Sequence, residues 1–204
     1  ISKGVPMSEA PVKSNTQVKQ EILEFLDKTC GLVDTEKADH RCGTIHRNCL
    51  VLATSRNDMP RATPLEFFHE GLTLYIFGEG GGKTSNIKHN ENICAAVYEQ
   101  PMRHDVLQKS LQIFGKAQLI NAKDNELFFK EKAGKWNMYA VAEALGRPFM
   151  KGLDLQGPEK EAMVEKVLTS LILIKIEPYH IIVREYHTDF SMPKYEWKAS
   201  EEMS

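Results

Sequence analysis

A glycine loop followed by a cation and two hydroxyl groups is the strongest chemical signal in the sequence. Gly78-Glu79-Gly80-Gly81-Gly82 leads directly into Lys83, Thr84 and Ser85. Glycines allow main-chain N–H groups to converge, and a helix capped by Thr84 or Ser85 would add its partial positive charge. Lys83 adds a full charge, so the stretch suits a single phosphate better than a triphosphate. A solvated glycine loop with an ordinary surface lysine is the alternative, and the loop alone does not decide between them.

Two familiar nucleotide motifs do not fit this loop. Gly82-Lys83-Thr84 ends like a Walker A motif, but Phe77 stands where that motif needs its first glycine. Lys83 also occupies the place of the third glycine in the dinucleotide fingerprint. The strands around the loop look antiparallel, whereas a P-loop leads out of a parallel strand. Nucleotide hydrolysis is therefore not expected.

Polar and apolar residues alternate in the segments around the loop, which predicts that short strands position it. Turns of two to four residues separate them, and such short connections force antiparallel pairing. A strand that starts at Leu168 is expected to end at Pro178. These patterns predict a mainly β (α+β) fold, a small barrel with peripheral helices. Strands are expected at 49–55, 61–68, 72–77, 93–98, 110–120, 168–177 and 180–186, and helices at 16–29, 84–90, 124–132, 136–145 and 159–166.

Composition limits the classes of partner and compartment. The 204 residues carry a net charge of -2, so no basic face indicates a nucleic-acid partner. No apolar run approaches the roughly 20 residues that a membrane-spanning helix needs. Four cysteines are too few for a disulfide scaffold and favour reduced thiols in a cytoplasm. We expect a cytoplasmic protein.

One domain accounts for most of the chain. Residues 1–15 are polar and are expected to be mobile, and residues 1–6, which lack a signal-peptide pattern, read as a tag remnant before Met7. The domain is expected to span 16–190. Residues 191–204 are expected to form a polar tail.

Five segments, taken in order, resemble the split-barrel flavoproteins related to pyridoxamine 5'-phosphate oxidase. Each segment is degenerate, but their order, spacing and strand phase agree over about a third of the chain. The resemblance implies a six-stranded antiparallel split β-barrel and a homodimer with flavin mononucleotide (FMN) at the subunit interface. The segments are Leu52-Ala53-Thr54-Ser55, Met59 to Pro64, Leu74 to Phe77, Lys83 to Ile87 with Asn90 and Asn92, and Phe114 to Ala117.

The resemblance also implies roles for individual residues. Arg61 and Lys83 match positions that hold the FMN phosphate, and a planar guanidinium suits that task. Tyr75 and Ile76 match a segment that flanks the cofactor, and Ser110 matches a polar residue that touches FMN from the other subunit. The full set of expected cofactor-binding residues is Arg61, Ala62, Thr63, Pro64, Leu65, Glu66, Tyr75, Ile76, Lys83, Thr84, Ser85 and Ser110.

Three departures separate the chain from the vitamin B6 oxidases. Gly82 stands where those members carry an arginine, and Glu66 stands where they carry a lysine. Their C-terminal Trp and Arg cluster has no clear counterpart, since Trp197 is isolated in the sequence. Glu66 would lower the flavin reduction potential if it faces the ring, or it points to solvent or pairs with a lysine. The interpretation is an FMN-binding oxidoreductase that acts on an unidentified small molecule.

No catalytic residue can be named, and three other functions stay open. Tyr98 and His104 are weak acid–base candidates, and NADH or NADPH could reduce a bound flavin although no motif selects either.

His180 or His187 could ligate haem in a haem-handling relative, which a Soret band would reveal. His40, Cys42, His46 and Cys49 resemble a metal series, but Cys49 begins an apolar strand expected in the core. A non-enzymatic flavin binder is the third alternative, with helix 16–29 engaging a partner through Val18, Ile22, Phe25 and Leu26 instead of packing on its own barrel.

Overall fold

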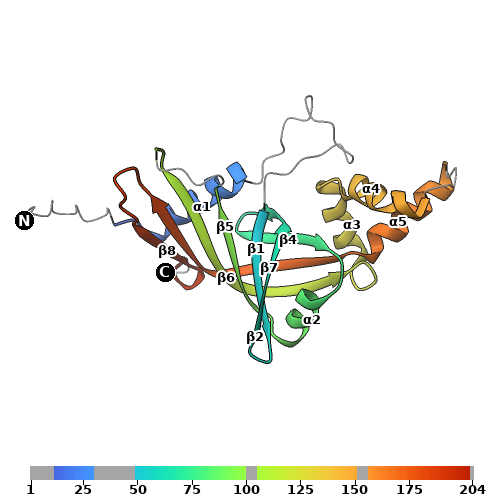
Figure 1. Ribbon diagram of the computed structural model, residues 1–204, viewed down its shortest axis with the longest axis horizontal. Coiled ribbons are helices and arrows are strands. Elements are labelled where there is room, and N and C mark those ends of the chain that lie inside the picture. Colours follow the sequence, from blue (N-terminus) through green and yellow to red (C-terminus); the bar gives the residue numbers. More distant parts are fainter. Residues whose placement is uncertain (1–11, 30–48, 100–104, 151–155, 203–204) are drawn as a thin grey trace, which may run out of the picture.

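The computed structural model describes residues 12–29, 49–99, 105–150 and 156–202, and one antiparallel sheet dominates it (Figure 1). The sheet order is β2-β1-β5-β6-β7-β4-β3, and β8 also pairs with β7. The helices are α1 (Asn15–Thr29), α2 (Gly82–His89), α3 (Glu126–Lys135), α4 (Met138–Met150) and α5 (Pro158–Ser170), with the short 3-10 helix η2 at Ala199–Glu201. The strands are β1 (Cys49–Arg56), β2 (Met59–Glu66), β3 (Phe68–Glu70), β4 (Thr73–Gly78), β5 (Asn92–Tyr98), β6 (Gln108–Asn121), β7 (Ile172–Tyr186) and β8 (Lys194–Lys198).

The predicted fold class, an antiparallel barrel-type sheet with peripheral helices, is confirmed. The sheet has eight strands in the described residues, where the family resemblance implied a six-stranded barrel, and it is not closed. One extra strand arises at Phe67, which is fully buried and separates β2 from the short strand β3. The hairpin of β1 and β2 turns at Asn57 and Asp58, whose φ values of 50° and 59° match the twist that a two-residue turn requires.

Two apolar clusters hold the fold together. In the larger one, α1 packs on the barrel, and the four apolar residues predicted on its face, Val18, Ile22, Phe25 and Leu26, are all buried. This confirms the interpretation of an ordinary helix that covers its own barrel. The smaller cluster joins α3, α4 and α5 to β4 and β6 around Phe129, at the other end of the sheet (Figure 1). None of the helices in the described part of the chain has the length and apolar character needed to traverse a lipid bilayer.

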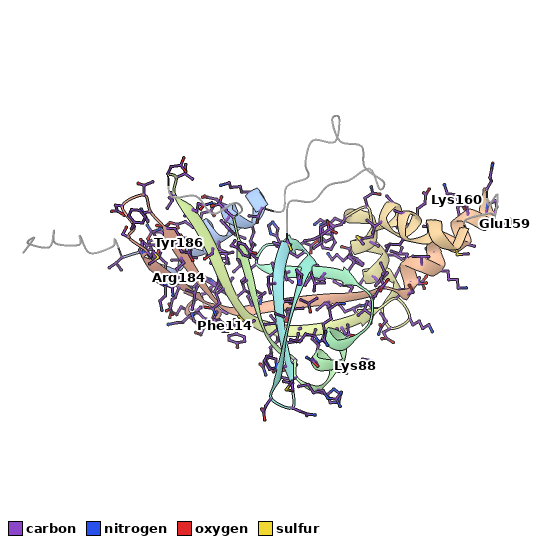
Figure 2. All side chains as sticks on the ribbon, viewed as in Figure 1. Lys88, Phe114, Glu159, Lys160, Arg184 and Tyr186 are labelled. Atoms are coloured by element: carbon purple, nitrogen blue, oxygen red, sulfur yellow. The ribbon has the colours of Figure 1, made fainter. Side chains whose placement is uncertain are left out.

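Strand β7 runs without interruption through Pro178, so the expected break at this proline is wrong. The pairing with β6 shifts at this point, from Phe114 opposite His180 to Gly115 opposite Pro178, which leaves Tyr179 as the extra residue of a β-bulge. A proline cannot donate a ladder hydrogen bond, and a bulge is one of the few places in a sheet that tolerates it. Figure 2 locates Phe114 beside the bulge, where its ring stacks on that of His180.

The C-terminal segment is not the polar tail that the sequence suggests. Strand β8 lies within it and pairs with β7, and Trp197, which looked isolated in the sequence, is 3% exposed in the core. Its Nε1–H donates to Glu202 at 2.9 Å. Tyr195 and Trp197 alternate with charged residues over five positions only, a pattern too short to stand out in a charged segment.

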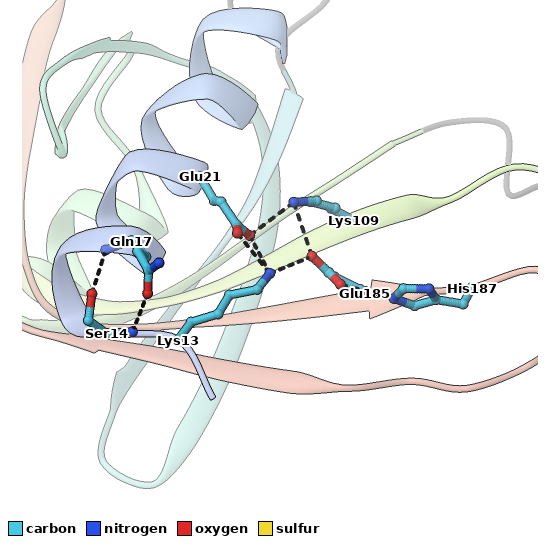
Figure 3. Close-up of polar contacts among 7 residues, drawn as sticks. All are labelled: Lys13, Ser14, Gln17, Glu21, Lys109, Glu185 and His187. Carbon is cyan, nitrogen blue, oxygen red and sulfur yellow. Dashed lines mark hydrogen bonds and ion pairs between the residues drawn. The ribbon is translucent and has the colours of Figure 1, made fainter. Parts of the chain in front are cut away.

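An ion-pair network fixes the residues that precede α1 (Figure 3). Lys13 Nζ lies 2.7 Å from Glu21 and 3.1 Å from Glu185 of β7, and Lys109 of β6 lies 3.0 Å and 3.1 Å from the same two carboxylates. His187 bonds the second Glu185 oxygen at 2.9 Å. Within the segment expected to be mobile, residues 12–15 are therefore ordered, and residues 1–11 lie outside the described residues.

Replacing Gly115 with alanine should lower the free energy of unfolding by about 1–3 kcal/mol, as overpacking typically does. A Cβ at this position would lie 2.8 Å from the main-chain oxygen of Glu177, and that oxygen belongs to the paired strand and cannot swing away. Urea unfolding measures the effect. Gly134→Ala in α3 is the control, because its Cβ would meet nothing within 4 Å. Equal losses in the two variants would contradict the close approach.

The network also predicts how stability depends on pH. Burial opposes ionisation of Glu185, but hydrogen bonds from His187, Lys13 and Lys109 outweigh it and lower the pKa of this carboxyl from 4.5 to about 2. A lowered folded-state pKa stabilises the fold above the ordinary value and loses that contribution as pH falls through the lower one. The unfolding free energies of the wild type and Glu185→Gln should therefore differ most above pH 4.5 and converge toward pH 2. A pH-independent difference would show that the charge of Glu185 contributes nothing.

Candidate functional site

Strand β2 and the start of helix α2 bring together the two cations predicted to hold a phosphate. The guanidinium of Arg61 lies against Gly82, the first residue of α2, so closely that a Cβ there would be 2.6 Å from its Nε and Cζ atoms. Lys83 folds back over the glycine loop, where its Nζ donates to the main-chain oxygen of Glu79 at 2.8 Å. The absence of a side chain at Gly82 is what admits Arg61 to this place.

The hydroxyl groups of Thr84 and Ser85 have different hydrogen-bond partners. Gly81, with φ of 146°, caps α2, so the expected cap at Thr84 or Ser85 is wrong. Thr84 is buried, and its hydroxyl accepts from Gly81 N–H at 2.9 Å and donates to Gly81 O at 2.8 Å. Thr84 thus shapes the helix start, while Ser85 Oγ accepts from Arg56 Nη1 at 3.1 Å. Arg56 was not predicted as a site residue, because its position at a hairpin end gives no sign that it folds back onto α2.

Positive charge is concentrated at this helix start. Arg56, Arg61 and Lys83 come from β1, β2 and α2, and none of them forms an ion pair with a carboxylate in the ranges that the structure describes. The free N–H groups of the first helical turn add a partial positive charge of their own. Like charges repel, so an arrangement of this kind is stabilised by an anion.

Asparagine side chains hold α2 on strand β1 and thereby fix the cluster. Asn86 Nδ2 donates to the buried hydroxyl of Thr54 at 3.1 Å, and Asn90 Nδ2 donates to Ser55 Oγ at 3.2 Å. Asn90 Oδ1 in turn accepts from the main chain of Asn92 at 3.1 Å, at the start of β5. Asn86, Asn90 and Asn92, which carry part of the family resemblance, therefore fasten α2 to the sheet.

The strand expected to lie beside a flavin ring is open. Among the described strands, β2 pairs with β1 alone and forms one end of the sheet. Its expected site residues are exposed or half-buried: Arg61, Ala62, Thr63, Pro64, Leu65 and Glu66. Strand β4 is partly open as well, since its pairing with β3 stops at Tyr75 and leaves the edge from Ile76 to Gly78 without a partner strand in the described residues.

Tyr75 and Ile76 face opposite sides of β4, and neither side chain is exposed. Tyr75 packs in the smaller cluster with its ring 5.1 Å from Trp136, and burial together with the carboxylate of Glu70 raises the pKa of its hydroxyl. Ile76 is fully buried in the larger cluster. Only the main-chain edge of this segment can face a ligand without rearrangement.

Ser110 lies away from the cations at the start of α2. It pairs with Tyr98 at one end of β5, whereas Asn92, next to α2, forms the other end. Its hydroxyl is 3.2 Å from that of Tyr186, and Arg184 stands opposite it on β7 (Figure 2). The structure thus places the predicted cations at the start of α2, buries Tyr75 and Ile76 on β4, and sets Ser110 apart from both groups.

The residues that could have bound haem or a metal ion lie in several different surroundings. His180 Nε2 is 3.1 Å from Glu196, and His187 Nε2 is bonded to Glu185, so each has a carboxylate partner. Cys49 is exposed, which corrects the expectation that it packs in the core. The histidine and cysteine residues of the metal series before Cys49, and His104, lie outside the described residues, and the remainder contains no cluster of metal ligands.

Comparison with known proteins identifies the family. The sequence pattern described as pyridoxamine 5'-phosphate oxidase matches residues 37–156, more than half of the chain, so the chain belongs to this family. No curated protein matches. Among solved structures, PhzG from Burkholderia lata 383, in complex with tetrahydrophenazine-1-carboxylic acid, is 11% identical with a TM-score of 0.54 over 97% of this chain and 93% of PhzG. A FAD-binding protein from Mesorhizobium loti is 16% identical with a TM-score of 0.46, covering 67% and 85%, and General Stress Protein 26 from Bacillus anthracis is 19% identical with a TM-score of 0.42, covering 87% and 98%.

Proposed function

We propose that this chain is a flavoprotein that binds FMN through its phosphate and acts as an oxidoreductase on a small molecule. The observation that carries the proposal is the group of Arg61, Lys83 and the amides of the first helical turn, which no carboxylate among the described residues neutralises. These residues fit a phosphate, because a guanidinium and an ammonium donate charge-assisted hydrogen bonds to its oxygens. Membership of the pyridoxamine 5'-phosphate oxidase family supports the same ligand.

The remaining expected residues would orient the flavin ring. Strand β2 from Ala62 to Glu66 offers an exposed surface beside the cluster, and the main-chain edge from Ile76 to Gly78 offers hydrogen-bonding groups. The flavin supplies the redox chemistry when bound, and the protein supplies binding, orientation and charge. A carboxylate such as Glu66 near the ring would disfavour the anionic reduced form and lower the reduction potential.

A second copy of the chain would complete the site. Directly opposed residues of neighbouring strands point to the same face, and the face turned away from the core is mostly apolar and half-buried. One row carries Ala53, Cys94 and Phe114, with His180 beside it. The next row carries Val51, Ala96 and Ile182, with the exposed Gln112 between the last two. The same face bears Ser110, far from its own cluster. We propose a cytoplasmic homodimer in which this face is covered and Ser110 approaches the flavin of the partner.

The phosphate assignment predicts a selective loss of binding. Arg61→Ala combined with Lys83→Ala should weaken FMN binding by at least about 100-fold, since two hydrogen bonds to a charged group are removed at about 1.5–3 kcal/mol each. Riboflavin, which has no phosphate, should bind equally to the variant and the wild type. Titration of the apoprotein by flavin fluorescence measures both affinities. Undiminished FMN affinity in the double variant would refute the assignment.

The dimer proposal predicts that a charge on the apolar face separates the subunits. Ala96→Glu would bury a carboxylate between two copies, so we expect a 23.2 kDa monomer that retains FMN poorly, where the wild type has twice that mass. Lys88→Glu, at the exposed end of α2, is the control and should stay dimeric. Light scattering coupled to gel filtration measures the mass. A monomeric wild type with full FMN occupancy would contradict the proposal.

Turnover decides between an oxidoreductase and a passive flavin binder. Anaerobic addition of NADH or NADPH should bleach the flavin absorbance if either serves as the electron donor. A flavin that neither donor nor any screened small molecule reduces would favour the binding function alone.

A further inference from the structure

Arg56 stands beside Arg61 in the sheet although it was not expected in the site. Thr54 pairs with Arg61 and Arg56 pairs with Met59, so Arg56 and Arg61 are diagonal neighbours on one face of the β1–β2 hairpin. Helix α2 is fastened to this same face by the bond between Asn86 and Thr54. The hairpin therefore directs both guanidinium groups toward the start of α2.

The bonding of Arg56 leaves most of its donors available. A guanidinium has five N–H groups, and one of those of Arg56 donates to the hydroxyl of Ser85 at 3.1 Å. Arg56 is exposed and makes no ion pair with a carboxylate in the described part of the chain. Ser85, a neutral acceptor, orients Arg56 without neutralising it. A long cationic side chain held in this way beside two other cations is poised for an anion.

The number of cations bears on which anion fits. A phosphomonoester carries between one and two negative charges near neutral pH, because its second pKa lies at about 6. The phosphates inside a dinucleotide such as FAD carry one charge each, and riboflavin carries none. Arg56, Arg61 and Lys83, together with the helix amides, form a concentrated site that gains most from a doubly charged terminal phosphate.

We infer that Arg56 is a third cation of the phosphate site, and that Arg56 and the missing side chain at Gly82 together make the site select FMN over FAD and riboflavin. This inference rests on the proposed flavin function and adds to it a third cation and the residues that would discriminate between FMN, FAD and riboflavin. Arg56 supplies the charge that distinguishes a dianion from a monoanion. Gly82 supplies the space in which Arg61 lies against the helix start.

The test is a set of titrations of the purified apoprotein with FMN, FAD and riboflavin, followed by flavin fluorescence. Arg56→Ala should weaken FMN binding about tenfold, with a smaller loss for FAD and none for riboflavin. Gly82→Ala should also weaken FMN binding by displacing the Arg61 side chain, and its melting temperature should stay near that of the wild type, because the guanidinium is the mobile end of a flexible chain. Arg56→Lys should restore part of the lost affinity, since it keeps the charge.

Lys88→Ala is the matched control, because it removes a cation from the exposed last turn of the same helix. It should leave all three affinities within about twofold of the wild type. Unchanged FMN affinity in Arg56→Ala, while Arg61→Ala weakens binding, would overturn the role of Arg56 and leave the proposed function intact. An equal loss for FMN and riboflavin would also overturn it, because it would show a merely structural effect. A wild type that binds none of the three would refute the proposed function itself.

Discussion

Like charges held at the start of a helix are the constraint around which the rest of this structure is arranged. Arg61 reaches Gly82 from β2, Lys83 bends over the glycine loop, and Arg56 is tied to Ser85. Their mutual repulsion would drive such groups apart in a loose loop. Here α2 is fastened to β1 by two asparagine side chains, and the hairpin that carries both arginines has a tight two-residue turn. The rigidity of the hairpin and the helix keeps the charges in place for an anion.

Beside these charges the sheet has open edges and a half-buried outer face. Strand β2 is an end of the sheet in the described residues, and β4 has an open edge next to β3. The outer faces of β1, β5 and β6 carry half-buried apolar side chains together with the exposed Gln112. Ser110, the predicted contact from a second subunit, lies at the far end of β5 from α2. The proposed two-fold dimer would use this separation, because its symmetry would bring Ser110 of one subunit toward the cations of the other.

The sequence predicted the antiparallel sheet and the five helices, because alternation, turn residues and a glycine loop are local signals. The family resemblance pointed to Arg61 and Lys83, which the structure places at the start of the same helix. It did not predict that β7 continues through Pro178, since the bulge depends on the opposing Gly115, which lies about sixty residues away in the sequence. Strand β8 was missed because Tyr195 and Trp197 show their inward alternation over five residues only. Arg56 was missed for a related reason: its bond to Ser85 is a tertiary contact, and no local pattern encodes it. Gly82 stands where the vitamin B6 oxidases carry an arginine. The structure gives the physical reason, because the Arg61 side chain fills the space that a side chain at position 82 would need.

We propose above all that the cations at the start of α2 hold the phosphate of FMN. A crystal structure of the protein with FMN tests it most directly. We predict phosphate oxygens within about 3.2 Å of Arg61 and Lys83, with the flavin ring along β2 and a second copy of the chain over it. Density for the phosphate at any other place, with these cations facing solvent, would contradict the account.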